Sequence, residues 1–162
     1  MMQIKKIIVV CANIISMKKI IVIFFFLSLG ISANVYSAEL EFIFDWSDLR
    51  KCTSGNPNTV TNPIFYLNNI PKNTKYIQFS LSDRNATSYN HGGGKVDISE
   101  IKVIKEKETN FGKYEFVIEP GKFKYKSPCP PSGKHTYEWT AKAKDEKNKI
   151  IGKKARSKQK YP

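Results

Sequence analysis

The chain has 162 residues, of which 41% are hydrophobic, 25% charged and 12% aromatic. These values exclude a disordered or collagen-like chain and are typical of a single globular domain. Ten Phe and eight Tyr favour strands over a helical bundle. The net charge of +13 comes from 24 Lys and only 3 Arg against 14 acidic residues. Because bidentate recognition of phosphates and bases uses Arg, this excess of Lys argues for solubility or weak surface attraction and against nucleic acid as a partner.

The first 37 residues predict a leader that is removed on export. Residues 17–19 (MKK) precede an apolar run at 20–31, which is shorter than a membrane-spanning helix requires. Small and polar residues follow, as a signal peptidase needs. We therefore expect a secretory signal peptide, cleaved after Ser37 or Ala38.

Residues 1–16 repeat the same basic-then-apolar pattern. Either the leader is extended or translation starts at Met17, which we favour. Residues 38–162 then form one predicted domain with 23 basic and 14 acidic side chains. A domain of this length can bury a core. We expect it to be periplasmic or secreted.

Two cysteines belong to this predicted domain, Cys52 and Cys129. An even number of Cys in an exported chain indicates a disulfide, because the compartments outside the cytosol are oxidising. The alternative is two free buried thiols. We expect a Cys52–Cys129 bond, which would stabilise the fold by about 4 kcal/mol in the chain-entropy model.

Several segments alternate apolar and polar residues, which predicts half-buried strands. These segments are 39–46, 75–83, 111–121 and 135–145. A hairpin turn is expected at 145–149, followed by a Lys-rich edge strand at 150–160. The periodicity leaves open whether 96–104 forms a strand or a short helix. The prediction is an all-β fold, an antiparallel β-sandwich with at most one short helix near 99–110.

Four stretches rich in Gly, Pro, Asn, Ser and Thr are expected to be loops. They are 51–61, 68–74, 84–94 and 126–133. The third contains three consecutive glycines after His91, and the fourth contains three prolines. By strand parity, Asp83 lies on the inward face at the end of its strand, and His135 shares the inward face of its strand with Tyr137. One end of the sandwich is therefore expected to gather Asp83, His91 and His135.

Three chemistries are compatible with such a cluster. A zinc site is not expected, because no HxH, HxxxH or CxxC spacing supports it. The HGGG at 91–94 matches an oxyanion-hole motif of some esterases, but the chain has no GxSxG, so no catalytic residues are assigned and an enzyme is not favoured. The remaining interpretation is a pocket for a small anion or polar headgroup without a cofactor. Two imidazoles of ordinary pKa, about 6.5, would bind anions better as both take up protons.

Two segments resemble the phosphatidylethanolamine-binding protein family, specifically its bacterial Raf-kinase-inhibitor-like branch. Residues 130–137 (PPSGKHTY) match the prolines, glycine, histidine and tyrosine of the family's Gly-x-Pro-Pro-x-Gly-x-His-x-Tyr motif. Asp83 keeps the first residue of the family's Asp-Pro-Asp-x-Pro motif, while Asn85 and Thr87 stand where that motif has its second Asp and last Pro. His91 follows at a plausible distance.

The resemblance implies a β-sandwich with few or no helices and a pocket for phosphate, phosphorylated headgroups or other small anions. The ligand-binding residues carried over from the family would be Asp83, His91, His135 and Tyr137, with Pro131 and Gly133 shaping the loop. The competing hypothesis is a basic surface-adhesion or structural envelope protein, which attracts an anionic membrane surface or glycan and in which the histidines are only structural.

Overall fold

The computed structural model describes residues 39–46, 49–109 and 112–162. The predicted signal peptide, its cleavage site and the alternative start at Met17 lie outside these ranges. Within them, no helix has the length and apolar character needed to cross a membrane.

The described residues are almost entirely strands and loops, so the all-β prediction is confirmed. The strands are β1 (Glu41–Asp45), β2 (Thr59–Thr61), β3 (Ile64–Asn68), β4 (Tyr76–Asp83), β5 (Asn90–Asp97), β6 (Lys102–Thr109), β7 (Gly112–Ile118), β8 (Lys124–Lys126), β9 (His135–Lys144) and β10 (Ala155–Tyr161). One 3-10 turn, Ile98–Glu100, separates β5 from β6, and the Asp97 side chain caps it by accepting from the N–H of Ser99. Residues 96–104, for which the periodicity left strand or helix open, are therefore the end of β5, this turn and the start of β6.

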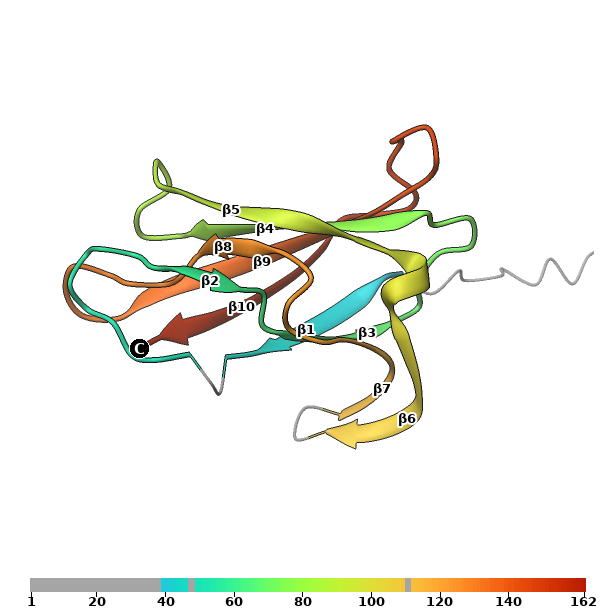
Figure 1. Ribbon diagram of the computed structural model, residues 1–162, viewed down its shortest axis with the longest axis horizontal. Coiled ribbons are helices and arrows are strands. Elements are labelled where there is room, and N and C mark those ends of the chain that lie inside the picture. The colour runs from blue at the N-terminus through green and yellow to red at the C-terminus, as the bar shows by residue number, and fades with distance from the viewer. Residues whose placement is uncertain (1–38, 47–48, 110–111) are drawn as a thin grey trace, which may run out of the picture. The chain divides into compact units, whose positions relative to one another are not determined.

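The strands pair antiparallel in three sheets. One four-stranded sheet has the order β1-β3-β7-β6, the other has the order β10-β9-β4-β5, and β2 pairs with β8. Figure 1 shows β4, β5 and β9 in one layer and β1, β3 and β7 in another. β10 lies at the edge of its sheet, as its lysines predicted.

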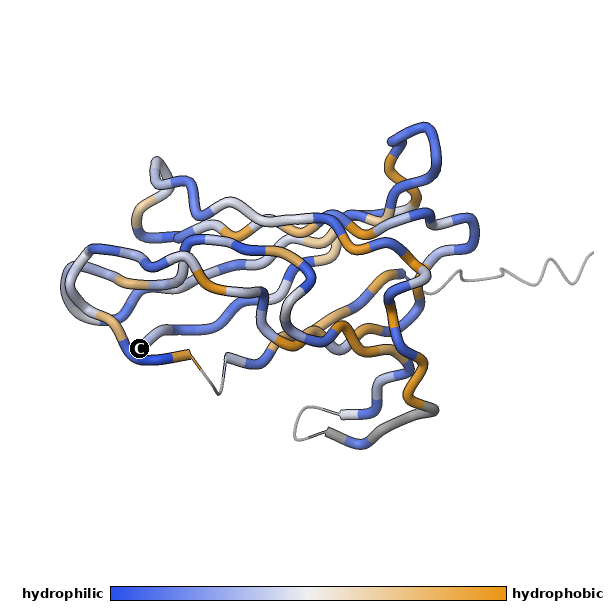
Figure 2. Tube along the Cα trace, viewed as in Figure 1, coloured by the Kyte–Doolittle hydropathy of each residue, from blue (hydrophilic) through white to orange (hydrophobic). Residues whose placement is uncertain are grey.

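Alternation along the strands builds the core between the two large sheets. In β9 the buried residues are Tyr137, Trp139, Ala141 and Ala143, and the residues between them are only partly buried. Phe65 of β3 stacks on Phe79 of β4 with ring centroids 4.2 Å apart. Figure 2 shows hydrophobic positions recurring along the strands, while the turn at 145–149 is hydrophilic. Each large apolar side chain buried in this way contributes roughly 1.5 to 3 kcal/mol.

Two of the predicted loops contain strands, which corrects the sequence interpretation. Residues 59–61 form β2, and His91 with its three glycines belongs to β5. A Cβ at Gly93 would lie 2.0 Å from the Phe79 carbonyl oxygen, and one at Gly94 would lie 2.2 Å from the Phe123 ring. β5 thus approaches β4 and Phe123 too closely for a side chain, so packing requires these glycines.

The last predicted strand was placed too early in the chain. Ile150 makes an isolated bridge to Lys144, and β10 begins only at Ala155. The segment in β3 was not predicted at all. Its buried residues Phe65 and Leu67 alternate with partly buried neighbours, so the period-two signal was present but short.

Candidate functional site

Asp83 and His135 meet at one end of the sandwich because they occupy the adjoining ends of β4 and β9. Asp83 is the last residue of β4 and pairs in register with Tyr137. The Nδ1–H of His135 donates to Asp83 Oδ2 over 2.7 Å. Asp83 is 3% exposed, whereas the His135 side chain retains 16% of its exposure. With Nδ1 engaged by the carboxylate, Nε2 is the ring nitrogen left for another partner.

The second carboxylate oxygen of Asp83 organises the loop after β4. Oδ1 accepts from the backbone N–H groups of Asn85 and Ala86, over 2.8 and 3.1 Å. Asn85 in turn accepts from the N–H of Thr136 over 2.8 Å, and the N–H of Arg84 donates to the Thr136 carbonyl. Asn85, which replaces the second Asp of the family motif, therefore ties this loop to the start of β9 beside His135.

The pKa values of Asp83 and Tyr137 leave the carboxyl group charged and the phenol uncharged at neutral pH. Burial acts to raise the pKa of Asp83, but hydrogen bonds from His135, the Asn85 N–H and Tyr137 outweigh it and hold that pKa below its usual range. Burial and the nearby Asp83 charge raise the pKa of Tyr137. At neutral pH the cluster thus contains a carboxylate and a protonated phenol.

His91 is the most enclosed imidazole of the cluster. Its Nδ1–H donates to the Lys126 carbonyl over 2.8 Å, and its ring meets Tyr137 edge-on with centroids 5.4 Å apart. Burial lowers the pKa of His91 and outweighs the opposing effects of the Lys126 hydrogen bond and the Asp83 charge. The expectation of two histidines with ordinary pKa values is therefore wrong for His91, because β5 carries it into the interior.

Tyr89 is a residue of this region that the sequence analysis did not single out. It precedes β5 and is 41% exposed, and its ring lies edge-on to His91 with centroids 4.6 Å apart. The signal was an aromatic residue two positions before a histidine, outside any apolar alternation. The Tyr89 ring therefore continues the side of the cluster formed by the His91 ring out to the solvent.

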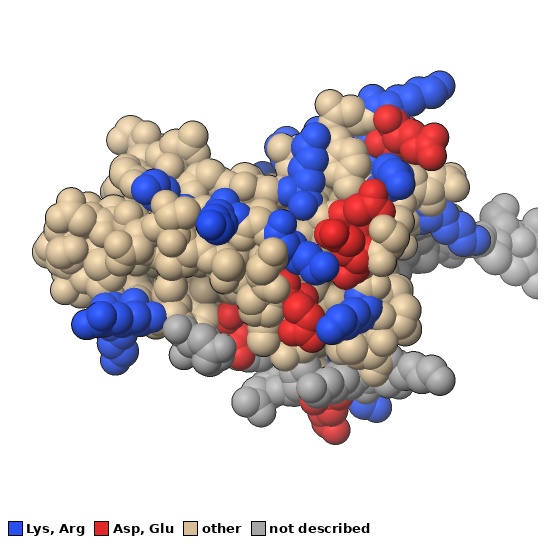
Figure 3. All heavy atoms as spheres, viewed as in Figure 1, with Lys and Arg blue, Asp and Glu red and all other residues tan. Residues whose placement is uncertain are grey.

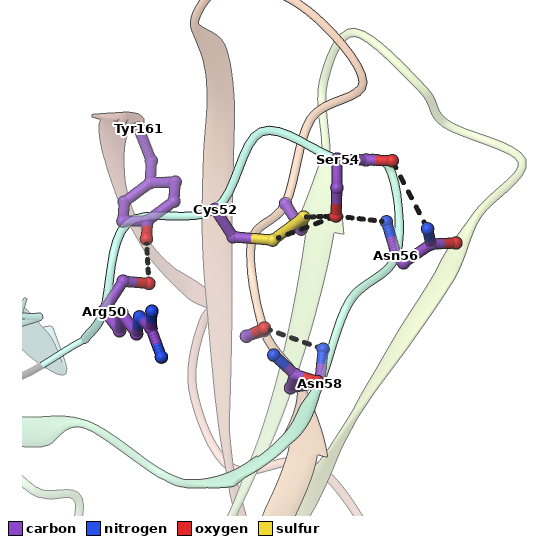
Figure 4. The surroundings of a disulfide bond; sticks show 8 residues. Arg50, Cys52, Ser54, Asn56, Asn58 and Tyr161 are labelled. Atoms are coloured by element: carbon purple, nitrogen blue, oxygen red, sulfur yellow. Dashed lines mark hydrogen bonds between the residues drawn. A yellow bond between two sulfur atoms is a disulfide. The ribbon is translucent and has the colours of Figure 1, made fainter.

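The Pro-rich loop lies beside this cluster and is fixed by a disulfide. Cys52 and Cys129 are bonded, as predicted, with their Cα atoms 4.7 Å apart. A Cβ at Gly55 would lie 3.3 Å from Pro131, so the two loops also pack at that point. Gly133 has φ +63°, a left-handed conformation that favours glycine. Figure 4 shows the disulfide with Ser54 hydrogen-bonded to it.

The structure brings Asp83, His91, His135 and Tyr137 together, and it places Pro131 and Gly133 in the loop that leads into β9. Across the parts of the chain that the structure describes, no group of three or more His, Cys, Asp or Glu side chains is arranged to hold a metal ion.

The strand pairing defines this protein as an antiparallel β-sandwich, and a buried Asp is hydrogen-bonded to a partly exposed His at one end. No family model matches the chain, and no curated protein matches it. Among solved structures, it is similar to a phosphatidylethanolamine-binding protein homologue from Chlamydia trachomatis, with 13% sequence identity and a TM-score of 0.45, covering 76% of this chain and 97% of that one.

Proposed function

We propose that the protein binds a small anion or a phosphorylated headgroup at the cluster of Asp83, His135, Tyr137 and His91. The observation that carries this proposal is the 2.7 Å hydrogen bond between His135 Nδ1 and Asp83. The carboxylate orients the ring through Nδ1 and leaves Nε2 directed away from it, and in a protonated imidazole Nε2 is also a donor. A partly exposed imidazolium with a fixed Nε2–H is suited to an anion oxygen.

Basic side chains on the face drawn in Figure 3 support an anionic ligand. In the view of Figure 3, several Lys and Arg side chains are visible over the left-hand end, and no Asp or Glu is visible there. The resemblance of residues 130–137 to the family motif points to the same ligand class. Basic side chains near a site raise the local concentration of anions and their rate of encounter.

His135 alone is assigned the pH-dependent step. Burial lowers the pKa of His91 and so favours its neutral form, and its Nδ1–H is already donated to the Lys126 carbonyl. His91 and Tyr89 then line the site, and an anion bound at Nε2 of His135 would favour the protonated form of that ring. Anion affinity is expected to rise as pH falls through the range in which an imidazole takes up a proton.

Thermal unfolding with and without phosphate tests this proposal, at pH about 5.5 and about 8, where an imidazole is mostly charged or mostly neutral. A ligand that binds only the folded state raises Tm, so phosphate should stabilise the wild type more at the lower pH. His135→Ala should lose this difference, and Lys142→Ala, on the opposite face of β9, should keep it. Equal shifts in all three proteins would mean nonspecific screening by lysines. Phosphoethanolamine in place of phosphate tests whether a headgroup binds better than the free anion.

We also propose that the domain is exported to the periplasm or secreted. The Cys52–Cys129 disulfide supports this location, since such bonds persist mainly outside the cytosol. N-terminal sequencing of the protein from the periplasm or medium should give a start near Ala38 or Glu39. A start at Met1 or Met17 in a membrane fraction would contradict the proposal.

A further inference from the structure

A cavity of about 480 Å³ opens elsewhere in the domain, between the end of β1, the β2–β8 pair and the start of β3. It shares no described lining residue with the cluster around Asp83 and His135. Its volume lies in the range of small-molecule sites, which is roughly 300 to 1,000 Å³. Its lining includes Trp46, Arg50, Asn58, Val60, Asn62 and Tyr125.

Much of the wall is apolar and rigid. Trp46 packs edge-on against Phe44, with ring centroids 4.6 Å apart, and Tyr125 packs against Trp139 at 4.9 Å. Val60 and Ile64 add aliphatic surface from β2 and β3. The Asn62 side chain is saturated by four backbone hydrogen bonds, so it fixes the wall and has little capacity left for a ligand.

Arg50 and Asn58 are two polar lining residues with side-chain donors that can bond a ligand. Among the described residues, the Arg50 guanidinium has no ion-pair partner, whereas Arg84 and Arg156 both lie within 4 Å of Glu138. Asn58 uses its backbone N–H and carbonyl to bond Ser127, which leaves its amide side chain without a hydrogen bond in that part of the structure. Figure 4 shows the Arg50 and Asn58 side chains directed toward the same space.

Arg50 is held in place through its backbone. The Tyr161 hydroxyl donates to the Arg50 carbonyl over 2.7 Å, and the disulfide at Cys52 anchors the chain two residues later. A guanidinium on an anchored segment loses less conformational freedom on binding than one on a free loop, which favours affinity. Its planar fork matches a carboxylate with two parallel hydrogen bonds.

We infer that this cavity is a second binding site, for an amphipathic monocarboxylate. The carboxylate of the ligand pairs with Arg50 and accepts from the Asn58 amide, and an aromatic or aliphatic body lies against Trp46 and Val60. Such a ligand differs from that of the Asp83–His135 cluster because it needs an apolar body, which inorganic phosphate lacks.

Isothermal titration calorimetry of the domain with 4-phenylbutyrate, 4-phenylbutan-1-ol and 4-phenylbutylamine tests this inference. The wild type should bind the carboxylate most tightly and the amine least. Arg50→Gln should weaken 4-phenylbutyrate by about tenfold or more, as expected for a lost hydrogen bond between charged groups, and leave the alcohol unchanged. Arg156→Gln is the matched control and should bind like the wild type.

Two further variants separate this site from the other cluster and from misfolding. Val60→Trp should fill the cavity and abolish binding of both the carboxylate and the alcohol, with thermal unfolding showing that the variant is folded. His135→Ala should leave 4-phenylbutyrate binding unchanged while it removes the phosphate response. The inference is overturned if Arg50→Gln binds the carboxylate as well as Arg156→Gln does, if the amine binds best, or if His135→Ala abolishes binding.

Discussion

The two candidate regions differ in how their polar groups are used. Around Asp83, both carboxylate oxygens are hydrogen-bonded, and His91 has given Nδ1–H to a backbone carbonyl. Around Arg50, the guanidinium of that residue and the side-chain amide of Asn58 line a cavity, and neither has an ion-pair or hydrogen-bond partner among the described residues. The first region is preorganised and nearly saturated, so it suits a small ligand bound by one or two donors. The second has room but fewer fixed groups, so shape and apolar contact must supply more of the affinity there.

Removal of the disulfide is expected to give the largest effect on stability, and it tests whether both regions depend on this bond. Replacing Cys52 and Cys129 together by Ala should lower the free energy of unfolding by about 4 kcal/mol, because a loop of this length is no longer closed in the unfolded chain. Urea unfolding measures the change. Wild type treated with a thiol reductant should match the double variant. A loss below about 1 kcal/mol would show that packing alone holds the two loops.

Gly94→Ala separates a packing role for the glycines from an anion-binding role. The new Cβ would lie 2.2 Å from the Phe123 ring, so that ring must move in a packed core. We expect a loss of about 2 kcal/mol in the free energy of unfolding, measured in urea without any anion present. Ser80→Ala, on the exposed side of β4, should change it by less than about 0.5 kcal/mol. An unchanged stability with a lost phosphate response would favour the anion role instead.

Asp83→Asn removes the charge from the first region and keeps an oxygen that can cap the loop. The loss should be about 1.5 kcal/mol at neutral pH, since a hydrogen bond to a charged group is replaced by one to a neutral amide. The folded-state pKa of Asp83 is lowered, so its contribution is present above the unfolded value of about 3.9 and disappears as pH falls. Urea unfolding at pH 6 and pH 3 should show the difference between wild type and variant shrinking. A constant difference would mean that the charge contributes nothing.

His91→Gln gives the smallest effect and isolates the buried imidazole. Because the folded-state pKa of His91 is lowered, the unfolded chain binds the extra proton first, below about pH 6.5. The wild type should therefore lose stability relative to the variant as pH falls from 7 to 5.5, by at most about 1.4 kcal/mol per pH unit. The glutamine amide can still donate to the Lys126 carbonyl. Parallel stability curves for the two proteins would contradict the neutral assignment.

The sequence predicted the first region well because its chemistry is carried by strand parity and a compact motif. The alternation in 135–145 placed Tyr137 inward, and Asp83 is buried at the end of its own alternating strand, as predicted. The prediction that all of 84–94 forms a loop is wrong, because residues 90–94 belong to β5. Glycine clusters are permissive in loops, but they are also required where two strands and an aromatic ring approach closely, and only the packing of Phe123 distinguishes these cases.

The second region was not predicted, and its residues explain why. They come from separate stretches, at 45–46 with 49–50, at 58–64 and at 120–127, none of which carries a recognisable motif. Which guanidinium lacks an ion-pair partner among the described residues is a property of the folded state, since the sequence does not say that Arg84 and Arg156 lie beside Glu138. The sequence held only one hint, the scarcity of arginine in a chain rich in lysine.

Trp46 connects the two regions, because it lines the cavity and its ring contacts a residue of the cluster. One contact of its ring is with Tyr137 of the cluster, at 5.9 Å between centroids, and the same side chain lines the cavity. The Tyr161 ring packs edge-on against the Trp46 ring, with centroids 5.7 Å apart, and the Tyr161 hydroxyl donates to the Arg50 carbonyl. Substitutions in the cluster and in the cavity are therefore linked through this indole, and their effects on stability and binding should be non-additive. A double-mutant cycle between Tyr137→Phe and Val60→Ala would measure the coupling free energy between the cluster and the cavity.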